Sequence, residues 1–369
     1  MAPAMNALAA AISAVRLVIF IISSLNVSNP YTEPAKGLPP EMTAIHNLCY
    51  TAFSLLQHKN HAVTCQLLIN RNRNVTALER FGLSVALATP FNRDGSIDLV
   101  KLGEHAASSI EGGCDSVTVF GTTGEGASIS AAERPQVLDY IGRSAVKPGR
   151  VVICIAATAV DDAARQCREA LDFGCKALLL PPPFYFKGVS DDGVFGWYAS
   201  LLERIGPNAR DAILYNIPSV TSVTVSHDVL ARLRAAFGGV IAGVKDSGGD
   251  WSYTEKLLDA HSDIAILVGD ERHLAAAVRR GGQGAISGIA NLFPAELRGL
   301  AIDGRDDPRI NALVELVLRY PVVPAIKVLI AHMSGHAEWS SVRAPLIDAN
   351  GAADTLVKSL QVIMARNAA

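Results

Sequence analysis

This chain of 369 residues lacks the patterns that define several common classes of protein. Its 33 lysines and arginines nearly balance 35 acids without forming a basic cluster, which argues against nucleic-acid binding. The six cysteines never form a C-x-x-C pair, as is typical of reduced thiols in a cytosolic protein. Gly335 lies within the histidine pair His332 and His336, and no H-E-x-x-H motif occurs. We therefore expect a cytoplasmic protein that binds neither metal nor nucleic acid.

The first 80 residues differ in composition from the rest of the chain. Leu8–Leu25 is almost entirely apolar but contains Arg16. A signal peptide would carry basic residues before the apolar run, and a membrane anchor would need roughly twenty uncharged apolar residues. The polar stretch at residues 26–40 and the stretch without a regular pattern at residues 60–80 favour a disordered extension, or one that results from a start codon placed too early. Membrane attachment is the second interpretation, and membrane binding by the rest of the chain is not expected.

From Leu83 onward, short apolar runs alternate with amphipathic stretches. The candidate strands are Leu83–Thr89, Ser116–Gly121, Val151–Ala156, Ala177–Leu180, Ala212–Ile217, Ile241–Lys245, Ile264–Gly269 and Gly284–Ile289. Candidate helices between them include Asp98–Glu111, Ala131–Ser144, Asp161–Phe173, Asp191–Ile205, Ser226–Phe237 and Glu271–Arg280. Apolar runs that are each followed by a helix indicate a parallel sheet, and eight such units predict a closed (β/α)8 TIM barrel over residues 81–293.

The sequence after Asn291 changes to a helical pattern that continues to the end. The expected helices are Pro294–Ile302, Arg309–Arg319, Val323–Met333 and Ala353–Ala365. We therefore predict that residues 294–369 form a helical extension after the barrel.

Lys245 is the most informative residue, because it is a lone lysine near the end of the sixth predicted strand. An ammonium group held in apolar surroundings loses hydration, which favours the neutral amine. A neutral amine attacks a ketone and forms a Schiff base. A strand-end lysine can also simply extend toward solvent, so the interpretation depends on its neighbours.

Other chemically capable residues also lie at or just beyond the carboxyl ends of predicted strands. Because the carboxyl ends of barrel strands meet on one face, we expect these residues to converge: Thr122, Thr123, Tyr185, Tyr215, Lys245, Asp270, Glu271 and Ser287.

The glycine turn Gly121–Gly126 offers backbone amides and two hydroxyls to a carboxylate, and it lacks the G-x-x-x-x-G-K-[ST] pattern of nucleotide-binding loops. The phenol of Tyr215 can carry protons beside a lysine. Each residue also has a purely structural interpretation: a glycine-rich loop, an aromatic side chain that closes the barrel, or, for Asp270 and Glu271, acids at a helix N-terminus.

Taken together, the motifs resemble the dihydrodipicolinate synthase / N-acetylneuraminate lyase family of pyruvate-dependent class I aldolases. The resemblance covers residues 83–369 and depends on five motifs: Gly121–Glu125, Pro183–Tyr185, Tyr215–Pro218, Gly243–Ser247 and Gly282–Ile286. It implies a TIM barrel that needs no cofactor, acts on pyruvate or another 2-keto acid, and assembles as a homotetramer built from two dimers.

The resemblance also assigns roles to residues. It implies that Lys245 is the Schiff-base lysine and that Tyr215 shuttles protons, with Thr122 and Tyr185 as relay partners. Tyr185 would reach toward a neighbouring subunit. The Gly121 turn and Thr123 would bind the pyruvate-derived carboxylate, and Ile286 would place a backbone carbonyl near the lysine.

One departure from the family pattern concerns the substrate. Members that make the lysine precursor usually carry Ser-Arg-Thr-Gly after the Tyr-Asn-x-Pro segment, and the arginine binds the carboxylate of aspartate semialdehyde. Here the run is Ser219-Val-Thr-Ser222, so Val220 takes the arginine's place. The positions of Asp270, Glu271 and Ser287 match those at which the neuraminate lyase contacts sugar hydroxyls.

These comparisons predict a lyase or aldolase that acts on a hydroxylated 2-keto acid. Three alternatives stay open: 4-hydroxy-tetrahydrodipicolinate synthase, a dehydratase of keto-deoxy sugar acids, and a non-catalytic barrel that binds a keto acid.

Overall fold

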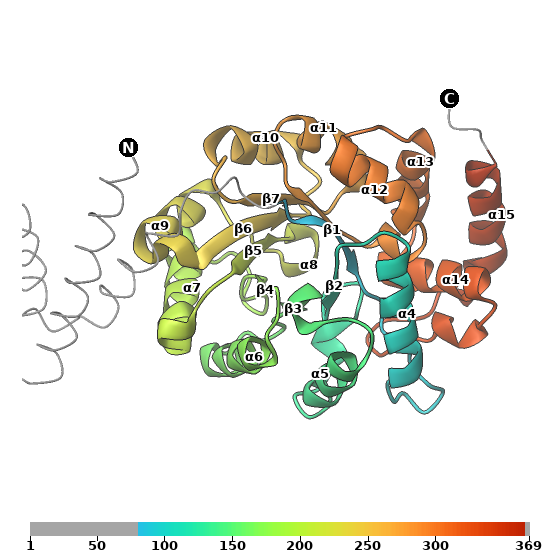
Figure 1. Ribbon diagram of the computed structural model, residues 1–369, viewed down its shortest axis with the longest axis horizontal. Helices are drawn as coiled ribbons and strands as arrows, with labels where there is room; N and C mark the ends of the chain where they lie inside the picture. Colours follow the sequence, from blue (N-terminus) through green and yellow to red (C-terminus); the bar gives the residue numbers. More distant parts are fainter. Residues whose placement is uncertain (1–79, 366–369) are drawn as a thin grey trace, which may run out of the picture. The chain divides into compact units, whose positions relative to one another are not determined.

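The computed structural model describes residues 80–365, in which eight parallel strands close into a barrel (Figure 1). The strands follow one another around the barrel in chain order: β1 (Gly82–Ala86), β2 (Ser116–Val119), β3 (Val151–Cys154), β4 (Ala177–Leu180), β5 (Ala212–Asn216), β6 (Ile241–Asp246), β7 (Ala265–Val268) and β8 (Gly284–Ser287). The predicted (β/α)8 fold is confirmed. The interpretation of the N-terminal extension concerns residues that, except for Arg80, lie outside the described part of the chain.

Helices cover the outside of the barrel, as the alternating sequence pattern predicts. They are α4 (Leu99–Glu111), α5 (Glu133–Arg143), α6 (Val160–Phe173), α7 (Asp191–Ile205), the short α8 (Pro218–Thr221), α9 (His227–Phe237), α10 (Trp251–Ala260), α11 (Glu271–Arg279) and α12 (Pro294–Asp303). Neither α8 nor α10 is among the helices proposed from the sequence. Helix α12 packs against β1 and β8 and thus belongs to the helical layer around the barrel.

Several strands end earlier than predicted because the chain turns out of the sheet there. Phe120, which directly follows β2, has φ of 61°, a left-handed conformation that does not continue a strand. Similarly, the chain leaves the sheet after Leu87, whose amide still donates to the Thr118 carbonyl of β2, although the next residues stay buried. The apolar run in the sequence is therefore longer than the strand, because the first residues of the following loop are buried too. The loops that carry the candidate site residues begin within these apolar runs.

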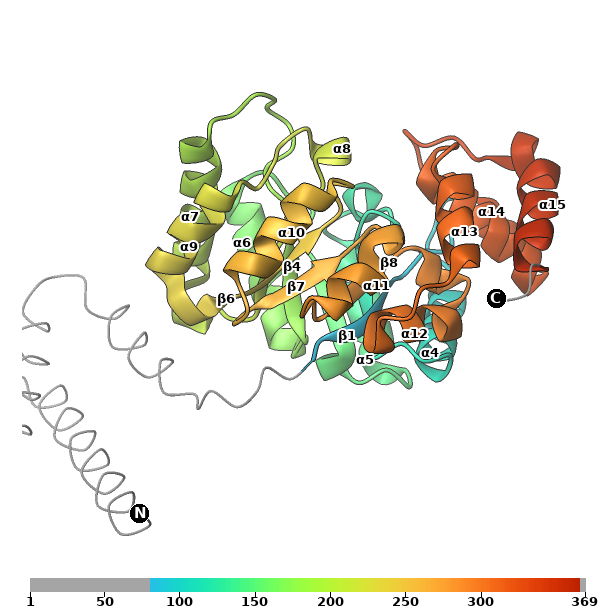
Figure 2. The same ribbon diagram turned by 90° about the horizontal axis from the view of Figure 1, so that it is seen from above.

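The remaining helices, α13 (Pro308–Val317), α14 (Val322–Ser334) and α15 (Ala353–Met364), pack beside the barrel (Figure 2). Helix α14 contacts the 3-10 turn Ile289–Asn291 that follows β8. Figure 2 shows that α13 and α14 reach the same end of the barrel as α8, which is the end where the strands terminate. In the part of the chain that is described, no helix combines the length and hydrophobicity needed to span a bilayer.

Candidate active site

Lys245 lies near the carboxyl end of β6, where its side chain enters the end of the barrel. The parallel register between β5 and β6 pairs it with Tyr215. Its Nζ atom is 4.1 Å from the centre of the Tyr215 ring, and Lys245 is only 5% exposed. Both residues line a cavity of about 200 Å³, which places an amine and a phenol side by side with little access to water.

The glycine turn after β2 brings two hydroxyls to the same cavity. The hydroxyls of Thr122 and Tyr215 are 3.3 Å apart and form a hydrogen bond, and Thr123 also lines the cavity. A Cβ atom at Gly124 would lie 2.6 Å from the Leu87 carbonyl oxygen, so only glycine fits there. The turn is therefore shaped by backbone packing, as its glycine content predicts.

Ile286, on β8, also lines the cavity, while the role predicted for its backbone carbonyl stays a prediction. Gly121 begins the turn but is not among the residues that line the cavity. Its contribution is to the conformation of the turn, since the Gly121 carbonyl accepts a hydrogen bond from the Gly126 amide at 3.1 Å.

A buried ion pair fixes the end of the glycine turn. Glu125 has φ of 53°, and its carboxylate accepts a hydrogen bond from Lys327 Nζ at 2.6 Å. Both side chains are fully buried, and Lys327, on α14, also donates to the Thr89 carbonyl at 2.9 Å. Burial lowers the pKa of Lys327, while Glu125 opposes that shift. Sequence analysis missed this contact, because the two residues are distant in the chain and Lys327 belongs to no motif.

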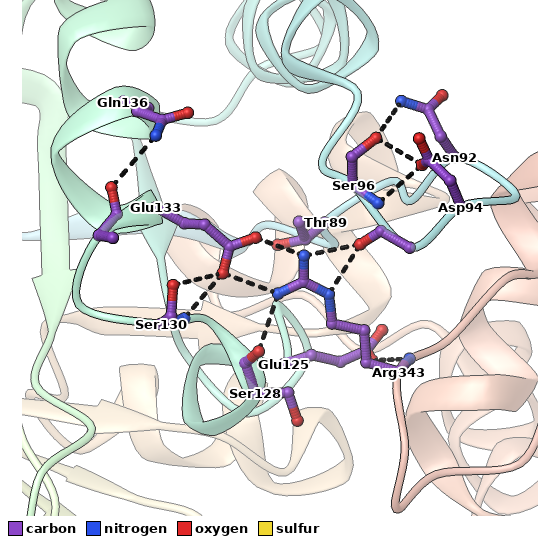
Figure 3. Close-up of polar contacts among 12 residues, drawn as sticks. Thr89, Asn92, Asp94, Ser96, Glu125, Ser128, Ser130, Glu133, Gln136 and Arg343 are labelled. Atoms are coloured by element: carbon purple, nitrogen blue, oxygen red, sulfur yellow. Dashed lines mark hydrogen bonds and ion pairs between the residues drawn. The ribbon is translucent and has the colours of Figure 1, made fainter.

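Arg343 holds the other side of the same turn (Figure 3). Its backbone amide donates to Glu125 at 2.8 Å, and its guanidinium donates to the carbonyls of Gly95 and Ser128 and to Glu133. The residues between α14 and α15 therefore tie the C-terminal helices to the loop that carries Thr122 and Thr123.

The two acids after β7 are largely committed to internal contacts. Asp270 caps α11 and accepts two hydrogen bonds from the Arg272 guanidinium, at 2.9 and 2.6 Å. Burial would raise the pKa of Asp270, but these bonds to Arg272 outweigh it and the pKa is lowered. Burial raises the pKa of Glu271, while a hydrogen bond from Ser287 at 2.6 Å partly opposes that rise. Both acids line the cavity.

Ser287 does not occupy the position predicted for it. Its hydroxyl is completely buried, donates to Glu271 and accepts from the Ala290 amide at 3.0 Å. Because side chains alternate along a strand, a one-residue difference in register moves a side chain to the opposite face. The next residue, Gly288, lines the cavity instead.

Tyr185 and Val220 are both exposed, but only Val220 lines the cavity. Tyr185 is 74% exposed and packs against the ring of Phe186, outside the set of cavity-lining residues. Val220, on α8, is 56% exposed at the rim. Within this single chain, therefore, Tyr185 does not join the lysine, tyrosine and threonine group.

The C-terminal helices supply a wall that sequence analysis did not foresee. Five apolar residues of α13, α14 and the turn between them line the cavity: Val314, Val317, Leu318, Val322 and Ile326. In the sequence these residues have the apolar pattern of an ordinary helix core. No feature of the sequence therefore distinguishes cavity-lining residues from core residues in these helices.

The described cysteines, Cys114, Cys154, Cys167 and Cys175, are buried and unpaired. Burial raises the pKa of Cys154 to about 11, although Lys245 opposes that shift, so this thiol is a poor nucleophile. No cluster of potential metal ligands occurs within residues 80–365.

The fold and the cavity define a TIM-barrel enzyme with a lysine at the carboxyl end of its sixth strand. The sequence model of the Dihydrodipicolinate synthetase family matches residues 79–361, and the chain belongs to this family. It is an enzyme of the lyase and aldolase type that characterises the family.

Individual relatives agree with this assignment. The chain is 32% identical over 278 residues to an uncharacterized DapA-like lyase of Chloroflexus aurantiacus, covering 72% of this chain and 91% of the relative. It is 31% identical over 236 residues to 4-hydroxy-tetrahydrodipicolinate synthase of Anaeromyxobacter sp. strain K, covering 63% of this chain and 78% of the relative. The crystal structure of dihydrodipicolinate synthase from Agrobacterium tumefaciens is 49% identical, with a TM-score of 0.76, and the alignment covers 77% of this chain and 99% of that one.

Proposed function

We propose that this enzyme is a class I aldolase in which Lys245 forms a Schiff base with pyruvate or a longer 2-keto acid. The observation that carries the proposal is the position of the Lys245 amine, 4.1 Å from the ring centre of Tyr215, whose hydroxyl is hydrogen-bonded to Thr122. This arrangement combines a nucleophile, a proton carrier and a partner that orients the carrier.

In the proposed mechanism, the neutral amine of Lys245 attacks the keto carbon and a C–N bond forms. Tyr215 delivers a proton to the carbinolamine hydroxyl, which leaves as water, and the iminium ion withdraws electrons from the adjacent carbon. Loss of a proton from C3 gives an enamine, which forms a C–C bond to the carbonyl carbon of an aldehyde. The alkoxide takes up a proton, and water hydrolyses the imine to release a 4-hydroxy-2-keto acid. The reverse sequence cleaves the same bond.

The carboxylate of the keto acid is assigned to the glycine turn. Thr123 lines the cavity, and backbone amides of a glycine turn form a concave anion site. This assignment is the one that the family resemblance implies for Thr123, which lines the same cavity as Lys245.

We also propose that the enzyme is a cytoplasmic homo-oligomer, a dimer of dimers, in which Tyr185 contacts the neighbouring subunit. The exposure of Tyr185 and Phe186, at 74% and 73%, supports this placement, because adjacent exposed aromatic side chains are typical of interfaces. Tyr185 would then enter the proton relay only after assembly.

Trapping of the imine tests the central proposal. The full chain is incubated with pyruvate and sodium borohydride, and intact mass and peptide mapping locate any reduced adduct. We expect one adduct on Lys245, none in Lys245→Ala, and an unchanged adduct in Lys101→Ala, because Lys101 lies in a salt bridge on α4. Folded protein without an adduct, or an adduct that survives Lys245→Ala, would exclude the proposed mechanism and favour a keto-acid-binding barrel.

A further inference from the structure

The cavity around Lys245 has two chemically different sides. One side carries the reactive group of Lys245, Tyr215, Thr122 and Thr123. The other is formed by apolar side chains of α13, α14 and the turn between them, with Val220 of α8 at the rim. A bound molecule that reacts at Lys245 and extends toward the rim therefore meets hydrocarbon on its second half.

The apolar side is partly exposed. Val220, Leu318 and Val322 are 56%, 51% and 39% exposed, and they are three of the ten large apolar residues that are exposed in the described part of the chain. All three line this one cavity. Exposed apolar residues that gather at one concave site mark a place where an apolar group binds, because contact removes both surfaces from water.

Beyond Lys245, the described residues supply the cavity with no cation that could pair with a second carboxylate on the substrate. Lys245 is the only cation among the described residues that line it. Lys187, on the loop after β4, donates to the backbone carbonyls of Phe184 and Thr221. A second carboxylate on the substrate would consequently enter the cavity without a cationic partner, which is costly.

Substrate hydroxyl groups would compete with internal donors for the acids of the cavity. Both carboxylate oxygens of Asp270 accept from Arg272, and Glu271 accepts from Ser287. Two serines, Ser219 and Ser247, line the cavity with hydroxyls available for one or two polar groups. Either hydroxyl can donate to the carbonyl oxygen of an aldehyde.

We propose that the acceptor is an aldehyde with a short alkyl or aryl tail, which lies against Val220, Leu318 and Val322. This inference rests on the proposed function, since it concerns the aldehyde that the Lys245-bound enamine attacks. The reaction joins C3 of pyruvate to the aldehyde carbon and gives a 4-hydroxy-2-keto acid without loss of atoms or change of overall oxidation state. A cavity of about 150 Å³ is known to bind benzene when its walls are apolar. The cavity here is about 200 Å³, a volume that the tail shares with the pyruvate-derived enamine, and the exposed residues at its rim let the tail extend toward solvent.

A panel of aldehydes tests the proposal on the full chain. Benzaldehyde and hexanal represent the apolar class, glyceraldehyde the hydroxylated class, and succinic semialdehyde the class with a second carboxylate. Formation of the 4-hydroxy-2-keto acid is followed by chromatography in the presence of pyruvate. We expect kcat/KM for the two apolar aldehydes to exceed the others by about tenfold or more, the factor that one hydrophobic contact provides.

Variants locate the selectivity. Leu318→Ser and Val322→Ser should each lower kcat/KM for benzaldehyde by about tenfold, with a much smaller effect on glyceraldehyde. Val100→Ser is the matched control, because Val100 is 54% exposed on α4 and does not line the cavity. It should leave the whole profile unchanged.

Three outcomes would overturn the inference. Glyceraldehyde or succinic semialdehyde could prove the better substrate, or the serine variants could leave the profile unchanged. Alternatively, the wild-type enzyme could fail to react with apolar aldehydes, and the same variants could dissociate an oligomer. That result would mean that the exposed residues form a subunit contact. Borohydride trapping with pyruvate alone separates these outcomes from failure of the Schiff-base mechanism, because that trapping needs no aldehyde.

Discussion

At the scale of single residues, the reactive group follows from β-strand register and the neighbouring glycine turn. Tyr215 and Lys245 are paired across β5 and β6, so a one-residue slip would turn one of them out of the cavity. Thr122 reaches Tyr215 because the glycine turn after β2 brings the backbone close to the barrel end. These three positions were predictable from motifs, whereas the orientation of Ser287 was not, because a motif does not reveal which of two adjacent residues faces inward.

The residue at position 220 gives a direct test of substrate choice. Val220→Arg places a guanidinium at the cavity rim, where it can form paired hydrogen bonds with a carboxylate. We expect condensation of pyruvate with aspartate semialdehyde to rise by about tenfold or more, since hydrogen bonds to charged groups contribute roughly 1.5–3 kcal/mol. Val220→Met is the uncharged control of similar length. Equal rates in the two variants would mean that Val220 does not occupy the position of the carboxylate-binding arginine.

At the scale of elements, α14 both lines the cavity and anchors the glycine turn. Ile326 lines the cavity, and the adjacent Lys327 forms the buried pair with Glu125. The sequence predicted the helix from its apolar periodicity, but pairing between residues separated by 202 positions left no local signal. Helix α10, Trp251–Ala260, is not among the predicted helices, although its apolar pattern is as strong as that of α9, which is among them.

Loss of Lys327 should affect both stability and catalysis. Lys327→Met leaves the Glu125 carboxylate buried without its cation, which costs about 3–5 kcal/mol in free energy of unfolding. Because Glu125 ends the turn that carries Thr122 and Thr123, we also expect imine formation with pyruvate to slow by on the order of tenfold to a hundredfold. Chemical denaturation and quenched borohydride trapping measure the two effects.

A second ion pair provides the control for that experiment. Lys101 and Glu338 also join the barrel to the C-terminal region, at 2.9 Å, but do not touch the glycine turn. Lys101→Met should change neither the free energy of unfolding nor the rate of imine formation appreciably. Combining Lys327→Met with Glu125→Gln removes the stranded charge and should recover part of the stability. A normal trapping rate in destabilised Lys327→Met would show that the pair stabilises the fold without positioning the turn.

At the scale of the whole molecule, the barrel and the C-terminal helices are joined by polar contacts whose strength depends on pH. Arg343 holds Glu133 and lowers the pKa of that carboxyl group to about 2 from 4.5. A carboxyl group whose folded pKa is depressed stabilises the fold above its unfolded pKa. That contribution is lost as the pH falls from about 4.5 toward 2.

Acid denaturation tests this link. Glu133→Gln should lower the thermal midpoint at neutral pH, and the difference from wild type should shrink as the pH falls through that window. Asp139→Asn, which removes an exposed pair with Arg143 on the same helix, is the control and should show little difference at any pH. A difference between Glu133→Gln and wild type that stays constant from neutral pH to pH 2 would contradict the assignment.

The closed barrel, its strand order and the lysine could be predicted because they follow from short apolar runs and local motifs. The cavity could not, because five of its lining residues come from α13, α14 and the turn between them, and these residues look like any helix core. The strands and the C-terminal helices therefore contribute different properties: the strands position the lysine, and the helices shape the part of the cavity that the acceptor is proposed to contact. Under the proposed mechanism, substitutions along Val314–Ile326 would change which aldehyde is accepted while the strands keep Lys245 and Tyr215 in place, so closely related chains that share these residues need not share a metabolic role.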